Sequence, residues 1–167
     1  MAFDFEHKRV VVTGGSRGIG RAIGLGFAAA GADVSICARG AAALEATRAE
    51  IARHGHKAHA GVCDLADGGA VIRYVLEAGT ALGGIDVLVN NASGFGMGDD
   101  EAGWAAGLSV DVMAMVRASH AALPLLEAAA RKPPATQTGS AIVHISSISG
   151  FRASTRAPAY AAVKAAA

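Results

Sequence analysis

The sequence places a tyrosine and a lysine four positions apart, Tyr160 and Lys164, in the segment YAAVK. Near the start of a helix, residues four apart lie on one face, one turn from each other. A free phenol has a pKa near ~10, which is too high for efficient proton transfer at neutral pH. A nearby ammonium favours the phenolate, so this pair is suited to moving a proton. Taken alone, the same spacing also fits an ordinary contact on a helix surface.

A glycine-rich segment, TGGSRGIG, lies directly between an apolar run at residues 10–13 and a helical stretch. Glycines there allow a tight turn and let backbone amides approach a pyrophosphate, and the following helix N-terminus favours an anion. An ordinary turn between a strand and a helix is the alternative. The segment predicts a dinucleotide site made by Gly14, Ser16, Arg17, Gly18, Ile19 and Gly20.

The second apolar run ends in Ala38 and Arg39, where a dinucleotide-binding domain contacts the adenosine ribose. An acidic residue there would accept hydrogen bonds from the ribose 2′-hydroxyl and repel a 2′-phosphate. Arg39 instead offers a guanidinium suited to phosphate oxygens, and Arg17 could reach the same group. The two arginines therefore predict NADP rather than NAD as the cofactor. The alternative is that both are simply solvated.

An alternation of strands and helices must position these residues. The strands read as unbroken apolar runs, which indicates a parallel sheet covered on both faces. Right-handed crossovers then give a doubly wound α/β fold with its ligand site at the carboxyl ends of the strands. We expect strands at residues 10–13, 33–38, 57–62, 85–90 and 140–146. We expect helices at residues 18–30, 41–54, 66–82 and 101–131, the last of which Pro124 is able to bend, and another from Pro158.

The segments TGGSRGIG, CDL, NNAS, ISSISG and YAAVK resemble, in order and spacing, those of the short-chain dehydrogenase/reductase family. The resemblance runs from about Lys8 to the last residue, and the glycine loop and ISS segment look most like those of β-ketoacyl-carrier-protein reductases. It implies a single NAD(P)-binding Rossmann-type domain over residues 1–167, with strand order 3-2-1-4-5.

The resemblance also implies roles for individual residues. By position, Tyr160 resembles the catalytic acid/base, and Lys164 the residue that assists it and binds the nicotinamide ribose. Ser147 resembles the serine that hydrogen-bonds the substrate oxygen. The cofactor contacts implied in the CDL segment and the NNA turn are Asp64, Leu65, Asn91 and Ala92.

Two residues depart from the family pattern. Ser93 stands where the family usually has a glycine after NNA, and it adds a side chain near the nicotinamide path. Counting from Trp104, Asp111 occupies the position of the asparagine that completes the family's catalytic tetrad. An ionised carboxylate accepts hydrogen bonds but cannot donate them, and its charge would offset part of the effect of Lys164 on Tyr160. We expect Asp111 to give a modified proton relay or a weaker activity.

The chain stops about nine residues into its last expected helix, without a capping Gly or Asn or a basic last turn. We interpret it as the front part of a longer family chain, without the family's last two strands and substrate lid. The fifth strand would then be a bare sheet edge, which is an association liability. For the full-length protein we expect a homo-oligomer.

Composition excludes several classes of protein. With 52% hydrophobic and 17% charged residues the chain can form a core, and its net charge of +1 gives no basic field for nucleic acid. The acidic N-terminus is no secretory signal, and no apolar run approaches the ~18 residues of a membrane span. Cys37 and Cys63 are expected to be reduced thiols of a cytoplasmic protein. His54, His56 and His59 would not share one face, so we expect no metal site.

These observations predict an NADP-dependent oxidoreductase that transfers a hydride between nicotinamide and a ketone or secondary alcohol, with a 3-oxoacyl thioester as one candidate substrate. The small-molecule carbonyl or alcohol is the expected partner. Two alternatives stay open. One is a catalytically inactive, truncated nucleotide-binding fragment, and the other is a structural subunit that pairs through its long helix.

Overall fold

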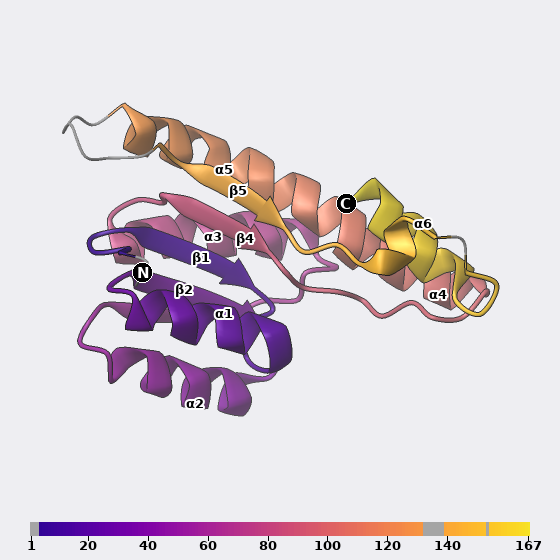
Figure 1. Cartoon of the computed structure of the whole chain (residues 1–167), viewed down its shortest axis with the longest axis horizontal. Coiled ribbons are helices and arrows are strands. Elements are labelled where there is room, and N and C mark those ends of the chain that lie inside the picture. Colours follow the sequence, from indigo (N-terminus) through magenta and orange to yellow (C-terminus); the bar gives the residue numbers. More distant parts are fainter. Residues whose placement is uncertain (1–3, 132–138, 153) are drawn as a thin grey trace.

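The computed structural model describes residues 4–131, 139–152 and 154–167. Its sheet has five parallel strands in the order β3-β2-β1-β4-β5, as predicted (Figure 1). The strands are β1 (Arg9–Thr13), β2 (Asp33–Ala38), β3 (Ala58–Val62), β4 (Val87–Asn90) and β5 (Ala141–His144). The helices are α1 (Gly18–Ala29), α2 (Ala41–Ala52), α3 (Gly68–Leu82), α4 (Glu101–Gly107), α5 (Ala114–Ala130) and α6 (Pro158–Ala166). A π-helical turn η1 (Leu108–Met113) joins α4 to α5, and a 3₁₀ turn η2 (Ile148–Gly150) follows β5.

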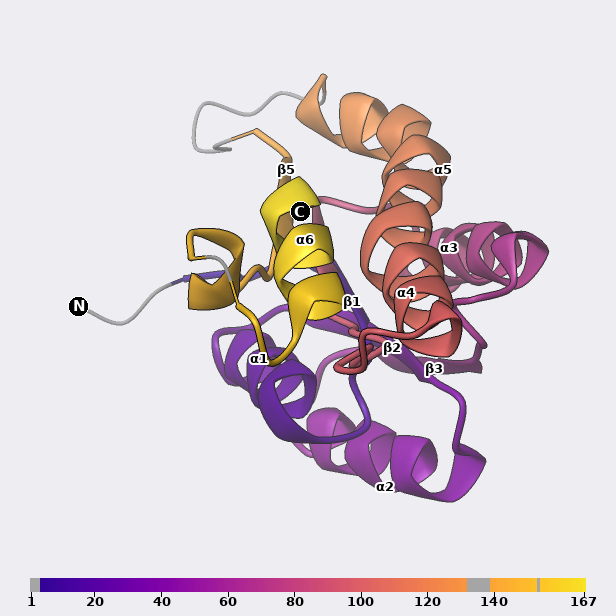
Figure 2. The ribbon, with the colours of Figure 1, turned by 90° about the vertical axis from the view of Figure 1, so that its right-hand side faces the viewer.

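The helices cover both faces of the sheet, which makes the fold a doubly wound α/β fold (Figures 1 and 2). Because successive side chains of a strand point to opposite faces, the central strand β1 contributes side chains to the hydrophobic core on each face of the sheet. Val11 packs in the core beneath α3 and α5, whereas Val10 and Val12 pack in the core beneath α1 and α2. All three valines are fully buried, and each such burial stabilises the fold by about 1.5–3 kcal/mol. The sheet is therefore the rigid support of the site.

Helix starts differ in a way that bears on function. Asp67 caps α3 by accepting from the amides of Gly69 and Ala70, and Asp100 caps α4 by accepting from the amide of Gly103. The carboxylate of Asp100 thus complements the N-terminus of α4. In contrast, α1 and α2 begin without any side-chain cap and without an acidic residue in the first turn. Their first amides remain available to an anion.

The predicted long helix at 101–131 is present but is not uniform. It runs from α4 through η1 into α5, and the irregular turn lies at residues 108–113, whereas Pro124 lies inside α5. A π turn holds one residue more than an α turn and often marks a functional position. Here the turn buries Asp111 while its end residues, Leu108 and Met113, stay exposed.

One of the two edge strands of the sheet is β5, whose four side chains are all exposed; the other is β3. Along the described ranges, no helix is both long enough and apolar enough to cross a lipid bilayer. Within the same ranges, His, Cys, Asp and Glu side chains form no cluster of three that could hold a metal ion.

Candidate active site

The glycine loop lies at the carboxyl ends of β1 and β2, the edge that faces the viewer in Figure 2. The amide of Gly15 donates to the carbonyl of Cys37 at 2.9 Å, which fixes the loop to β2. Gly18 has φ +57°, a left-handed conformation that favours glycine. A methyl group on Gly20 would overlap the carbonyl oxygen of Gly14, so the first turn of α1 lies directly on the loop. Ser16 is half-buried on this loop.

Two exposed residues of the loop, Arg17 and Ile19, lie next to the uncapped start of α1. Arg39 is also exposed, between the end of β2 and the uncapped start of α2. Both arginines therefore precede an uncapped helix start, a combination of residue type and backbone that favours an anion. Asp64 is exposed after β3, whereas Leu65 is buried.

Asn91 has a role that the sequence reasoning missed. Its side-chain amide donates to the carbonyls of Thr13 at 2.9 Å and Gly14 at 3.2 Å. The amide of Asn91 donates to the Thr13 hydroxyl at 3.1 Å, and the amide of Ala92 donates to it at 3.4 Å. Asn91 thus ties the turn after β4 to the glycine loop. Its place directly after a buried strand was the available signal.

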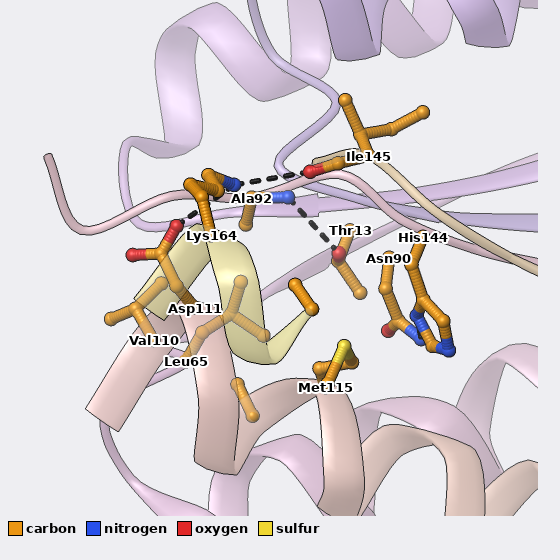
Figure 3. Close-up of a pocket in the computed structure, with 12 residues that line it drawn as sticks. Thr13, Leu65, Asn90, Ala92, Val110, Asp111, Met115, His144, Ile145 and Lys164 are labelled. Atoms are coloured by element: carbon orange, nitrogen blue, oxygen red, sulfur yellow. Dashed lines mark hydrogen bonds and ion pairs between the residues drawn. The ribbon is translucent and has the colours of Figure 1, made fainter. Parts of the chain in front are cut away.

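Lys164 is the most constrained charged group of the site (Figure 3). Its ammonium lies 3.0 Å from Oδ1 of Asp111 and donates to the carbonyl of Ile145 at 3.1 Å. The exposed fractions of the two side chains are 4% for Lys164 and 0% for Asp111. The same ammonium lies 5.8 Å from the ring centre of Tyr160. The predicted one-turn relationship between the two α6 residues is therefore present.

Asp111 connects three parts of the site. Its Oδ2 accepts from the amide of Gly94 at 2.8 Å, which holds the loop after β4 against the long helix. Its Oδ1 faces Lys164 but accepts no hydrogen bond from a described residue, so this contact is an ion pair only. The carboxylate thus neutralises the lysine and anchors a loop at once.

Ser147 lies at the start of η2, where its hydroxyl accepts from the amide of Ser149 at 3.2 Å. The hydroxyl of Ser146 donates to the carbonyl of Lys164 at 2.6 Å. A methyl group on Gly150 would overlap that same carbonyl, so η2 lies directly against α6. Ser147 and Tyr160 are both half-buried. Among the described residues, none hydrogen-bonds to the Tyr160 hydroxyl.

A small cavity lies behind Lys164, lined by polar and apolar side chains from β4, β5, η1 and α5 (Figure 3). Its volume is about 10 Å³, room for about one water molecule. On its other side the Asn90 side chain lies 3.2 Å from Nδ1 of His144 and 3.2 Å from the hydroxyl of Ser119. His144 is therefore a hydrogen-bonded residue of β5.

Comparison with known proteins identifies the family. The family model described as short chain dehydrogenase matches residues 8–167. The chain belongs to the short-chain dehydrogenase family. This short-chain dehydrogenase is 32% identical over 169 residues to the rhamnolipids biosynthesis 3-oxoacyl-[acyl-carrier-protein] reductase of Pseudomonas aeruginosa, covering 98% of the chain and 64% of the relative.

Two solved structures share its fold. A short chain dehydrogenase from Burkholderia cenocepacia in complex with NADP is 40% identical, with a TM-score of 0.86, over 96% of this chain and 64% of the other. A 7α-hydroxysteroid dehydrogenase complexed with NADH and 7-oxo glycochenodeoxycholic acid is 28% identical, with a TM-score of 0.88, over 99% of this chain and 63% of the other. The short-chain dehydrogenase spans less than two thirds of each of these three relatives.

Proposed function

We propose that this chain is the NADP-binding and catalytic part of an oxidoreductase that interconverts a ketone and a secondary alcohol. The observation that carries the proposal is the arrangement on α6. The hydroxyl of Tyr160 is free of hydrogen bonds within the described residues, and the buried ammonium of Lys164 is fixed 5.8 Å from its ring centre. The bound nicotinamide would supply the hydride.

The glycine loop fits the pyrophosphate of a dinucleotide. Gly20 leaves no room for a side chain between α1 and the loop, and the uncapped helix start offers amides to an anion. Arg39 and Arg17 favour NADP over NAD, because both guanidiniums are exposed beside uncapped helix starts. The Burkholderia relative, solved with NADP, supports this choice, although the steroid dehydrogenase was solved with NADH.

Each side chain then has a distinct task. Tyr160 would give its proton to the carbonyl oxygen as the alcohol forms, and Ser147 would hydrogen-bond that oxygen. An ammonium has three N–H donors, and in Lys164 one is taken by Ile145 while another faces Asp111. The third would be left for the nicotinamide ribose. A 3-oxoacyl thioester is one candidate substrate, since the Pseudomonas relative is a 3-oxoacyl reductase by name.

A catalytically inactive nucleotide-binding fragment is the second candidate. Asp111 favours this candidate, because it stands where the family pattern has an asparagine and forms a direct ion pair with Lys164. The two functions make the same prediction for cofactor binding and opposite predictions for turnover.

The test combines binding with turnover. Trp104 is the only tryptophan, so energy transfer from it to NADPH reports cofactor binding. NADPH oxidation with ethyl acetoacetate reports turnover, which Tyr160→Phe should abolish while NADPH still binds. Tyr74→Phe changes the only other tyrosine and should keep turnover. Binding without turnover in the unaltered chain would favour the inactive fragment, and absence of binding would refute both.

A further inference from the structure

Phe95 has an unusual backbone conformation for a large residue. Its φ is +50°, and only His7 shares a positive φ among the described residues other than glycine. A bulky side chain in the left-handed region is strained, and it persists only where the surroundings fix it. The side chain is nevertheless 66% exposed, so burial of the ring within this chain does not compensate for the strain.

The surroundings do fix this loop. Methyl groups on Gly94 and Gly96 would overlap the carbonyl oxygens of Ala106 and Gly103, so the backbone on both sides of Phe95 lies flat against α4. The amide of Phe95 itself donates to the hydroxyl of Ser93 at 3.2 Å. Ser93, a departure from the family pattern, therefore helps to hold the loop.

The loop belongs to the site around α6. Gly94 is bound by Asp111, which pairs with Lys164. The helix under the loop packs on α6, because a methyl group on Gly107 would lie 3.2 Å from the side chain of Val163, one turn from Tyr160. Figure 2 shows the loop after β4 passing close to the first turn of α6. The loop that carries Phe95 is thus connected to the candidate catalytic helix through Asp111 and through α4.

The chemistry of the loop is apolar. Residues 94–98 read GFGMG, and the side chains of Phe95 and Met97 are 66% and 51% exposed. These residues offer no polar side chain that could bind the hydroxyls of a sugar. An apolar ligand group, however, would gain from covering the ring and the thioether.

We propose that Phe95, with Met97, forms an apolar wall that binds the alkyl or aryl substituent of the carbonyl substrate. The substrate class would then be hydrophobic ketones and their alcohols rather than polyhydroxylated compounds. This inference rests on the proposed function, and its loop is a specificity-determining element of the same site.

The test uses a substitution that keeps the backbone conformation of the loop and removes its apolar side chain. Asparagine tolerates the left-handed region, so Phe95→Asn should preserve the backbone while deleting the apolar surface. Phe95→Leu should keep much of the apolar contact. Leu76→Asn, at a 50% exposed leucine of α3, controls for the loss of any exposed apolar residue.

The probes are ethyl acetoacetate and ethyl benzoylacetate, which differ by a methyl or a phenyl group on the ketone. In the unaltered chain, kcat/KM should be higher for ethyl benzoylacetate than for ethyl acetoacetate. In Phe95→Asn we expect kcat/KM for ethyl benzoylacetate to fall roughly tenfold and that for ethyl acetoacetate to change little, with Phe95→Leu between. Equal losses for both esters would overturn the proposal. So would a higher melting temperature of Phe95→Asn, from relieved strain, together with an unchanged ester preference.

A binding readout separates this inference from the proposed function. Trp104 directly follows Gly103, whose carbonyl touches the loop, so its fluorescence reports ester binding without turnover. One outcome is that NADPH is never oxidised, while ethyl benzoylacetate still binds more tightly than ethyl acetoacetate and Phe95→Asn removes that difference. This result would support the apolar wall and refute the proposed function. Equal binding of both esters, or binding of neither to the unaltered chain, overturns the wall.

Discussion

The ammonium of Lys164 lies 3.0 Å from Oδ1 of Asp111, and both side chains are almost completely removed from solvent. Removing two charges from water is costly, and only their mutual attraction and additional hydrogen bonds offset that cost. Here the carbonyl of Ile145 and the amide of Gly94 supply those hydrogen bonds. The pair thus joins α6, the π turn and the loop after β4.

Removing one partner of this pair should destabilise the protein strongly. In Asp111→Leu the buried ammonium loses its counter-charge and Gly94 loses its acceptor, so we expect a loss of about 3–5 kcal/mol in the free energy of unfolding. Urea unfolding measures it. The double variant Asp111→Leu with Lys164→Met should recover much of that loss, because it removes both charges. A double variant as unstable as Asp111→Leu would contradict this account.

An exposed ion pair gives the matched control. Arg131 lies 3.0 Å from Glu127 on α5, and both side chains are more than half exposed. Solvent and salt screen such a pair, so Glu127→Ala should leave the urea midpoint nearly unchanged.

A methyl group at Gly20 should damage the cofactor site. In Gly20→Ala it would overlap the carbonyl of Gly14, so the loop must move, at a cost of about 1–3 kcal/mol and with weaker NADPH binding. Gly26, also in α1, has open space around it, and Gly26→Ala should stabilise by roughly 0.5–1 kcal/mol. Thermal unfolding and Trp104 energy transfer would measure both. Similar effects from the two changes would show that the close contact is irrelevant.

Arg39 should discriminate between the two nicotinamide cofactors. Its guanidinium is exposed beside the start of α2, where a 2′-phosphate would gain a charge-assisted hydrogen bond. Arg39→Ala should weaken NADPH binding about tenfold and leave NADH binding unchanged. Arg53→Ala, at the other end of α2, should change neither affinity. A parallel loss of both cofactors in Arg39→Ala would remove Arg39 from the phosphate site.

His59 should make stability depend on pH. Burial lowers the pKa of the His59 imidazole, and the charge of Glu77 opposes that shift only in part. The ring stacks on Tyr74, and its Nδ1 lies 2.9 Å from the Ser35 hydroxyl. In the unfolded chain the histidine has a pKa of ~6.5, so the contribution of His59 to stability is complete above pH ~6.5. It is lost as the pH falls through the lower pKa of the folded state.

The measurement is the urea midpoint between pH 7.5 and pH 5. We expect the midpoint of the unaltered chain to fall more steeply with acidification than that of His59→Gln. His54→Gln, at an exposed histidine, should retain the steep fall. Identical slopes in the unaltered chain and His59→Gln would exclude a contribution from this ring.

The strands and their order could be predicted because local sequence carries that information. Continuous apolar runs such as VVVT and the glycine loop between β1 and α1 identify the elements and the ligand edge without tertiary detail. The partnership of Lys164 and Asp111 was also expected, but only through the family pattern. The roles of the individual site residues remain predictions.

Other features depend on how distant segments are brought into register. Ser35, on β2, hydrogen-bonds to Tyr74 of α3 at 2.9 Å, forming a buried polar chain that no local pattern indicates. Cys37 and Cys63 are free and buried, as expected, yet no local pattern indicates that the two thiols interact with each other. The interaction with Cys63, together with burial, raises the pKa of the Cys37 thiol, whereas the interaction with Cys37 lowers the pKa of the Cys63 thiol.

The π turn between α4 and α5 has a consequence for how this protein can tolerate insertions and deletions. Each α-helical residue advances the helix by about 100°. Deleting one residue of 108–113 would let the turn close as ordinary helix and would leave α4 and α5 nearly in their present orientation, because a π turn holds one residue more than an α turn. Asp111 lies inside the turn, so its side chain would turn away from Lys164, whereas the α4 carbonyls beneath Gly94 and Gly96 would keep their places. Even a loss that leaves the helix more regular would therefore dismantle the site.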